Sequence, residues 1–151
     1  MKKLWEKGGP IDPNVETFTT GNDPVLDLRL APYDVLGSIA HAVMLESVGL
    51  LAAEELAELR AALKAVYRRI QDGGFSIEQG VEDVHSQIEI EVTKVAGEAG
   101  RKIHTGRSRN DQVALDIRLY LRDYIRRLTG STSALFDTLL GLSDEHATDL
   151  M

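Results

Sequence analysis

The segment from Asn110 to the end of the chain carries the longest helical pattern in the sequence, and it restricts the possible folds most. Its apolar residues recur at helical spacing and form a wide face, made by Val113, Ile117, Tyr120, Leu121, Tyr124, Ile125, Leu128, Leu135, Leu139 and Leu142. A continuous helix of some forty residues would be roughly 60 Å long, whereas a globule of this chain length is about 40 Å across. Such a helix would project, and its apolar face would need partners from other chains.

One part of this helix is weak. Residues 129–133 read Thr-Gly-Ser-Thr-Ser, and all five are mediocre or poor helix formers. A glycine in a helix costs about 1 kcal/mol relative to alanine. A break at Gly130 would give two helices that fold back as a hairpin, so the pattern alone leaves both a continuous helix and a hairpin open.

Two further helices are predicted in the first half of the chain. The first covers residues 32–48, and its expected inward face consists of Leu36, Ile39, Ala40, Val43 and Met44. The second covers residues 53–70, and its apolar stripe consists of Leu56, Leu59, Leu63, Val66 and Ile70. A short turn with Gly49 joins them, so we expect an antiparallel hairpin. Neither helix suggests chemistry, and His41 is expected to be a structural residue.

A third helix is predicted over residues 82–95, with one face made by Val84, Ile88, Val92 and Val95. The alternation of Ile88, Ile90 and Val92 would also suit a strand, but it is too short to outweigh the helical period. Short helices are expected at Asp12-Pro13 and Asp23-Pro24, where the aspartate can cap and proline takes the first helical position. The expected fold is all-α, with a small helical domain at residues 1–109 followed by one long helix at residues 110–151.

Composition argues against several classes of function. The 151 residues carry a net charge of -7 and no cysteine, which opposes general binding to nucleic acid or anionic membranes and excludes disulfides and thiolate metal sites. Arg118, Arg122 and Arg126 form a basic ridge, but neighbouring acids and the lack of interleaved aromatic residues favour a solvated or ion-paired face. No apolar run reaches the roughly 18 residues of a membrane span, and no signal core follows Met1. We expect a cytoplasmic protein.

The densest group of ligand-type side chains lies where the long helix begins, at residues 104–112, with the sequence His-Thr-Gly-Arg-Ser-Arg-Asn-Asp-Gln. The first backbone N–H groups of a helix lack partners and favour an anion. Arg107 and Arg109 can add fork-shaped donors that suit a carboxylate or a phosphate. Short, orientable hydrogen bonds could come from Thr105, Ser108 and Asn110. The segment is therefore a candidate anion site.

The alternative for this segment is structural. Asn110 or Asp111 would cap the helix, Gly106 would make a turn, and the arginines would be solvated. The residue types alone do not decide between the two interpretations.

This segment, together with Glu82-Asp83-Val84-His85, resembles the first signature region of the argininosuccinate lyases, a branch of the fumarase/aspartase superfamily. Fumarases, aspartases and adenylosuccinate lyases have related but different loops here. The similarity runs along nearly the whole chain, from Leu4-Trp5 through residues 34–38 to the terminal helix. It implies one continuous helix in a central bundle, where four subunits assemble into a homotetramer.

The resemblance also implies an activity. Argininosuccinate lyases act in arginine biosynthesis and cleave argininosuccinate by β-elimination into arginine and fumarate, with no cofactor or metal expected. The aci-carboxylate formed on proton removal needs preorganised donors, which a donor-rich helix start can supply. By resemblance, Arg109, Asn110 and Ser108 would bind the substrate carboxylate, while Thr105 and Arg107 would shape the loop.

Three acidic or basic residues outside the loop have open roles. The resemblance places Asp83 and His85 near the substrate, but a first-turn acid also serves as a cap or salt-bridge partner, and their spacing supplies no metal-binding cluster. Asp23 stands where the family has a substrate-binding serine. It either replaces that serine as a ligand, loses the contact, or only caps a helix.

The catalytic acid and base of the family lie in two later regions, which are expected beyond Met151. The chain is therefore expected to be an N-terminal fragment that is inactive alone. The alternative is a non-catalytic helical oligomerisation module of the same superfamily, in which the loop only caps the helix.

Overall fold

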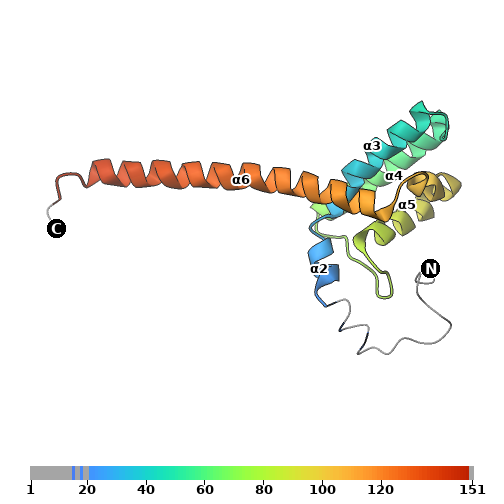
Figure 1. Ribbon diagram of the computed structural model, residues 1–151, viewed down its shortest axis with the longest axis horizontal. Helices are drawn as coiled ribbons and strands as arrows, with labels where there is room; N and C mark the ends of the chain where they lie inside the picture. Colours follow the sequence, from blue (N-terminus) through green and yellow to red (C-terminus); the bar gives the residue numbers. More distant parts are fainter. Residues whose placement is uncertain (1–14, 16–17, 19–20, 150–151) are drawn as a thin grey trace. The chain divides into compact units, whose positions relative to one another are not determined.

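The structure of the protein is a computed structural model that describes Val15, Phe18 and residues 21–149 (Figure 1). Every regular element in this described part is helical, which confirms the expected all-α class. The chain divides into two units, residues 1–117 and residues 118–151. The helix expected at Asp12-Pro13 lies outside the described residues.

Helix α2 (Asp23–Asp27) confirms the short helix expected at Asp23-Pro24, but its cap differs from the expected one. The cap position belongs to Asn22, which makes no side-chain cap hydrogen bond, and Asp23 is the first helical residue. The interpretation of Asp23 as the cap is therefore wrong, because the helix begins one residue earlier than expected. As an acid in the first turn, Asp23 still interacts favourably with the helix dipole.

Helices α3 (Ala31–Ser47) and α4 (Ala53–Gln71) lie side by side and form the expected hairpin. Gly49 adopts a positive φ of 76° in the turn between them, a conformation that glycine reaches without strain. The predicted stripe of α4 is confirmed: its members face the core as buried or partly buried residues, namely Leu56, Leu59, Leu63, Val66 and Ile70.

The predicted inward face of α3 is wrong. Leu36 is 47% exposed, Val43 and Met44 are each 42% exposed, and Ala40 is also exposed; only Ile39 packs against the core. Apart from Leu45, the buried face carries small or polar residues instead: Ala31, Asp34, Val35, Gly37, Ser38 and Ala42. The positions of the large apolar residues predicted the wrong inward side, because the inward side of α3 approaches α6 (Arg109–Glu145) too closely for large side chains. A Cβ on Gly37 would meet Cδ2 of Leu115 at 3.0 Å.

Helix α5 (Val84–Arg101) packs against α3 and α4 and continues into the 3₁₀ helix η1 (Lys102–His104). Val84, Ile88 and Val92 are buried as predicted. Val95 is 76% exposed, so its predicted inward position is wrong. The buried positions recur every fourth residue, and Ala96 takes the next one.

The hydrophobic core of the first unit lies among α3, α4 and α5, with contributions from the connecting segments. Its fully buried large residues include Leu45, Leu59, Leu63, Ile88 and Ile103. This core holds the starts of α5 and α6 against α3, which is where the candidate site lies.

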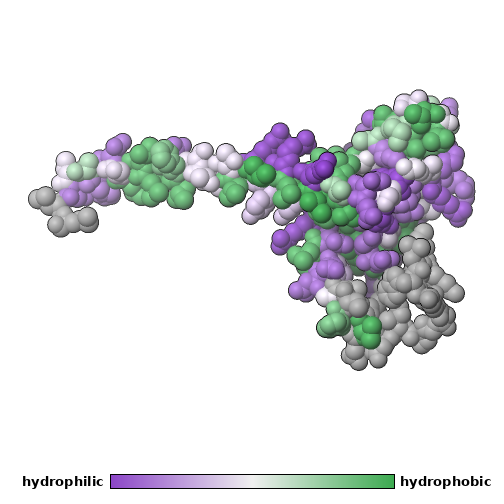
Figure 2. All heavy atoms as spheres, in the orientation of Figure 1, coloured by the Kyte–Doolittle hydropathy of each residue, from purple (hydrophilic) through white to green (hydrophobic). Residues whose placement is uncertain are grey.

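Helix α6 (Arg109–Glu145) begins where the sequence predicted and runs through Gly130 as one helix, which confirms the continuous alternative. Its first turns belong to the first unit and the remainder forms the second. The apolar residues of the second unit are about half exposed, and Figure 2 shows such side chains along α6: Leu121, Tyr124, Ile125, Leu128, Leu135, Phe136, Leu139, Leu140 and Leu142. Among the described residues, no helix has the length and apolarity of a membrane span.

Candidate functional site

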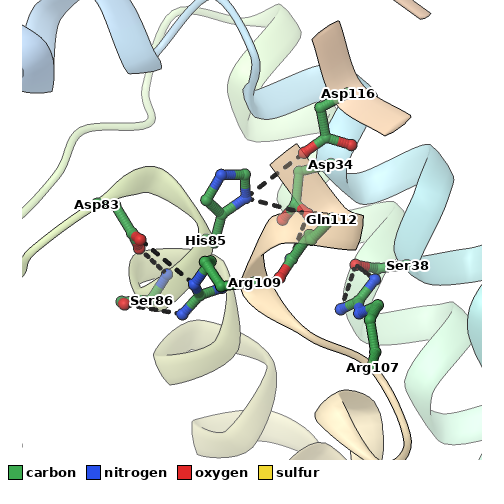
Figure 3. A network of polar contacts seen from close by, with 9 residues as sticks. All are labelled: Asp34, Ser38, Asp83, His85, Ser86, Arg107, Arg109, Gln112 and Asp116. Atoms are coloured by element: carbon green, nitrogen blue, oxygen red, sulfur yellow. Dashed lines mark hydrogen bonds and ion pairs between the residues drawn. The ribbon is translucent and has the colours of Figure 1, made fainter. Parts of the chain in front are cut away.

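Arg109 is the centre of a polar network at the start of α6 (Figure 3). Its Nε lies 3.3 Å from Oδ2 of Asp83, its Nη1 donates to Oε1 of Gln112 at 2.8 Å, and its Nη2 donates to Oγ of Ser86 at 3.2 Å. The side chain is 34% exposed. A guanidinium has five N–H groups, so donors remain after these three contacts. The network fixes the guanidinium plane and leaves part of it open to solvent.

Asp83 joins the start of α5 to the start of α6. It is the N-cap residue of α5, where its Oδ1 accepts a hydrogen bond from the backbone N–H of Ser86 at 2.7 Å, and its Oδ2 pairs with Arg109. The expected roles of cap and salt-bridge partner therefore occur together. The contacts bring two helix N-termini to one place, and their dipoles both favour a negative charge there.

The cap of α6 is Ser108, not Asn110 or Asp111 as the structural alternative expected. Oγ of Ser108 accepts a hydrogen bond from the backbone N–H of Asn110 at 3.1 Å, and the Ser108 N–H donates to Oδ2 of Asp111 at 3.1 Å. Ser108 takes the cap because the helix begins at Arg109, directly after it, while Asp111 closes a reciprocal bond. The exposed Asn110 side chain makes no hydrogen bond with any described residue.

The loop before α6 is anchored on α3 at two points. The Nη1 and Nη2 atoms of Arg107 donate to Oγ of Ser38 at 3.2 and 3.3 Å, and burial lowers the pKa of this guanidinium. Nε2 of His41 lies 2.9 Å from the carbonyl oxygen of Thr105, so the expected structural role of His41 is supported by its backbone contact. Gly106 makes the expected turn with a φ of 66°. Arg107 is thus directed into the protein, unlike Arg109.

Behind Arg109 lies a buried cluster of three ionisable groups, one each from α3, α5 and α6. Nδ1 of His85 lies 3.3 Å from Oδ1 of Asp34 and 3.5 Å from Oδ2 of Asp116, and no side chain of the three is more than 3% exposed. Gln112 connects the cluster to the network, because its Nε2 donates to Oδ1 of Asp34 at 2.5 Å. Both carboxylate oxygens of Asp116 are buried, and neither has a hydrogen-bond partner among the residues that the structure describes.

Burial and mutual charge set the protonation of this cluster. Burial, followed by the charge of Asp34, raises the pKa of Asp116 to about 7. Burial acts to lower the pKa of His85, but the carboxylates of Asp34, Asp83 and Asp116 outweigh it and raise that pKa. At neutral pH the cluster therefore retains protons that exposed groups of these types would release.

The same three residues correct the expectation that no set of metal-binding donors surrounds His85. One donor atom from each of Asp34, His85 and Asp116 lies within 4.8 Å of the others. Sequence spacing could not show this set because its members come from three helices. The raised pKa values of His85 and Asp116 favour protons over a metal ion at these atoms, and Oδ1 of Asp34 already accepts a bond from Gln112. We therefore interpret the set as a proton-sharing cluster.

Comparison with known proteins assigns the chain to a family. A family model described as Lyase matches residues 6–151. The chain belongs to this lyase family. Its resemblance to the argininosuccinate lyases is confirmed by relatives that carry that name.

Three of these relatives show how much of the lyase the chain covers. Argininosuccinate lyase of Bacteroides thetaiotaomicron is 50% identical over 150 residues, which are 99% of this chain and 34% of the relative. The enzyme of Parabacteroides distasonis is 52% identical over 145 residues, 96% of this chain and 32% of the relative. That of Methylococcus capsulatus is 48% identical over 155 residues, 100% of this chain and 32% of the relative. The chain thus spans about a third of the length of these relatives.

In this lyase chain, the structure brings most of the candidate residues together but not all. Arg109, Ser108 and Asn110 lie at the start of α6, and Asp83 contacts Arg109 directly. His85 is 3% exposed and faces the buried carboxylates, so it lies behind the network. Asp23 is exposed on α2 and makes no hydrogen bond or ion pair with any described residue.

Sequence analysis of the lyase chain missed five residues of the site: Asp34, Ser38, Ser86, Gln112 and Asp116. The first of the two predicted helices supplies Asp34 and Ser38 to this network, a contribution that the sequence pattern did not indicate. A signal was present in the spacing of residues 31, 35, 38, 42 and 45, which form a continuous stripe of buried positions on α3. Ser38 is the one polar residue of this otherwise apolar stripe, and a buried polar side chain needs a hydrogen-bond partner.

Proposed function

We propose that this chain is the N-terminal part of an argininosuccinate lyase, which cleaves argininosuccinate into arginine and fumarate by β-elimination. The observation that carries the proposal is the partly exposed guanidinium of Arg109, held by three side chains where α5 and α6 both begin. The names of the relatives, all argininosuccinate lyases, support the same substrate.

The geometry suits the recognition of a carboxylate that gains charge during the reaction. The remaining N–H groups of Arg109, the free amide of Asn110 and the hydroxyl of Ser108 are donors at one helix start. Donors that are fixed before the reaction stabilise a developing aci-carboxylate most effectively. Thr105 and Arg107 act indirectly, since their contacts with α3 hold the loop that carries Ser108.

The residues around this group have supporting roles. Asp83 orients Arg109 from the cap of α5, and His85 supports the same region from the buried cluster without touching the substrate. Asp23 would reach the substrate only in a complete site, and its exposed position on α2 leaves it available for such a contact. The proposed reaction uses no cofactor and no metal.

The catalytic acid and base are proposed to come from polypeptide that corresponds to the remaining two thirds of the relatives. The chain alone is expected to release no fumarate. We place the domain division at residues 1–109 and 110–151, with the second part forming the start of a central bundle, and we expect the complete enzyme to act in the cytoplasm.

The exposed apolar face of α6 supports a homotetramer as the working assembly. Its leucines, isoleucine and aromatic residues are about half exposed along the second unit. Burying such a face against other copies of the chain would release about 25 cal/mol for each Å² of apolar surface.

A direct test is a chimera in which this chain replaces the first third of the Bacteroides thetaiotaomicron enzyme, to which it is 50% identical. The chimera is expected to release fumarate from argininosuccinate, and Arg109→Ala should reduce kcat/KM by about 10- to 100-fold through loss of a charged hydrogen-bonding group in the site. Arg60→Ala, which removes an exposed arginine of α4, is the matched control. Equal losses in the two variants would contradict the proposed role of Arg109.

A second candidate is a non-catalytic module that associates through α6. It is favoured by one observation: Asp83, Ser86 and Gln112 already occupy three N–H groups of Arg109, as they would in a purely structural network. A chimera that assembles normally but releases no fumarate would support this candidate.

A further inference from the structure

Gln112 lies between the buried cluster and Arg109. Its side chain is on the first turn of α6, only 3% exposed, and both of its polar atoms are engaged: Oε1 accepts from Nη1 of Arg109 at 2.8 Å, and Nε2 donates to Oδ1 of Asp34 at 2.5 Å. Figure 3 shows it as the link between the two groups. No other residue of the described network contacts both Arg109 and the cluster.

We propose that Gln112 is a positioning residue, which transmits the fixed position of the Asp34 carboxylate to the guanidinium of Arg109. The inference rests on the proposed function of Arg109 as the ligand of a substrate carboxylate. It adds the element that holds this ligand in one orientation before the substrate arrives.

The direction of both hydrogen bonds follows from the chemistry of the partners. A guanidinium only donates, so the amide oxygen of Gln112 must face Arg109. The amide nitrogen must then face Asp34, whose Oδ1 has to be an acceptor at that point. A rotated amide would place donor against donor at Arg109 and acceptor against acceptor at Asp34. The orientation of Gln112 is therefore determined at both ends.

The other two partners of Arg109 do not provide the same support. Asp83 and Ser86 both belong to the start of α5, and Asp83 has an exposed fraction of 21%. Gln112 ties the guanidinium to α3 through Asp34, which is 1% exposed. Gln112 lies on the same helix as Arg109, and its buried bond to Asp34 holds its own side chain in place. An arginine side chain has many rotamers, and a partner that is itself fixed by a buried hydrogen bond removes more of them than a mobile partner does.

Because Arg109 is already held in one orientation, little conformational entropy is lost when it binds the substrate carboxylate. Without Gln112, Arg109 would keep its contacts with α5 and gain freedom around Nη1. Binding of a carboxylate would then have to restore this order, which weakens the complex.

The test compares Gln112→Met, which removes both polar atoms at similar length, with Gln112→Glu, which keeps the oxygen that accepts from Arg109. Solvent exchange of the Nη1–H protons of Arg109, the protons that face Gln112, is measured by NMR in the ¹⁵N-labelled chain. The exposed Arg60 is the internal reference, and Gln71→Met is the control for an exposed glutamine of α4. Circular dichroism checks that each variant is folded.

In the wild-type chain, Arg109 should exchange at least ~10-fold more slowly than Arg60, because its guanidinium is bonded on three sides. Gln112→Met should bring the two rates within about threefold, whereas Gln71→Met should leave the difference intact. In Gln112→Glu at pH 6, slow exchange should return, because the introduced carboxyl and Asp34 can hold one proton between them. A folded Gln112→Met chain with unchanged protection overturns the inference. If that variant does not fold, a folded Gln112→Glu chain in which Arg109 exchanges as fast as Arg60 overturns it.

Titration with fumarate separates this inference from the proposed function. Gln112→Met should weaken fumarate binding by about two- to tenfold, the cost of ordering one side chain on binding. Loss of protection in Gln112→Met, together with no fumarate binding by either the wild-type chain or the chimera, would support the positioning role and contradict the proposed function. Fumarate binding with unchanged protection would contradict the positioning role and support the proposed function.

Discussion

The buried cluster makes the stability of the chain depend on pH, and Asp116→Asn tests this most sharply. Asp116 has a pKa of about 7 in the folded chain, against an ordinary value of 3.8. A carboxyl whose pKa is raised by folding binds its proton more tightly in the folded state. Its contribution is greatest at acidic pH and is lost as the pH rises from 3.8 towards 7, where both states have released the proton. The raised pKa of His85 acts in the same direction.

The magnitude follows from the size of this interval. Each pH unit between the two pKa values removes about 1.4 kcal/mol from the free energy of unfolding. Between pH 5 and pH 8 the loss from Asp116 is at most about 3 kcal/mol, since it stops near pH 7. Asn at this position has a similar shape and no ionisation in this range. The difference in stability between Asp116→Asn and the wild type should therefore shift in favour of the variant by up to that amount as the pH rises.

Urea unfolding followed by circular dichroism at pH 5, 6, 7 and 8 measures this difference. Asp137→Asn is the control, because it removes an exposed carboxylate from the same helix. Its unfolding midpoints should remain parallel to those of the wild type. Midpoints for Asp116→Asn that stay parallel to those of the wild type would show that folding does not change the affinity of Asp116 for its proton, contrary to its raised pKa.

Four further single changes have expected outcomes. Gly100→Ala should destabilise the chain by about 2 kcal/mol or more in urea unfolding, because its Cβ would lie 2.5 Å from Cα of Thr93. Gly130 has open space around it, so Gly130→Ala should stabilise α6 by up to about 1 kcal/mol. Equal changes in the free energy of unfolding for the two variants would contradict the described packing. Asp83→Ala should cost about 1 kcal/mol through loss of the α5 cap and should also speed solvent exchange at Arg109; a loss of stability with unchanged exchange would separate the two roles. Leu139→Asp should lower the mass of the assembly in sedimentation, since Leu139 is 57% exposed on the apolar face of α6, and an unchanged mass would exclude this face from the interface.

The sequence was informative wherever large apolar residues alone decide which side of a helix is buried. The stripe of α4, from Leu56 to Ile70, was predicted correctly because no polar residue interrupts it. The inward side of α3 was not, because it carries Asp34, Ser38 and Gly37, while Leu36, Val43 and Met44 face outwards. Where two helices approach closely through polar residues, the large apolar residues no longer indicate the buried side.

The candidate site shows the same division between local and long-range information. The helix start at Arg109 and the donors beside it followed from the local pattern and from the resemblance to the lyases. Asp34 and Asp116 could not be paired from the sequence, because their proximity depends on how α3 and α6 pack. Gln112 was read only as the end of a motif, although it is the residue that joins the two halves of the network.

Binding of a substrate carboxylate at the start of α6 can be observed by titrating the ¹⁵N-labelled chain with argininosuccinate. Saturable shifts are expected for the Arg109 Nε–H signal and the Asn110 side-chain amide signals, with the Asn110 shifts abolished by Arg109→Ala and both sets retained in Arg60→Ala. Signals from Arg109 and Asn110 that remain unchanged at saturating argininosuccinate, in the chimera as well as in the chain alone, would contradict this binding.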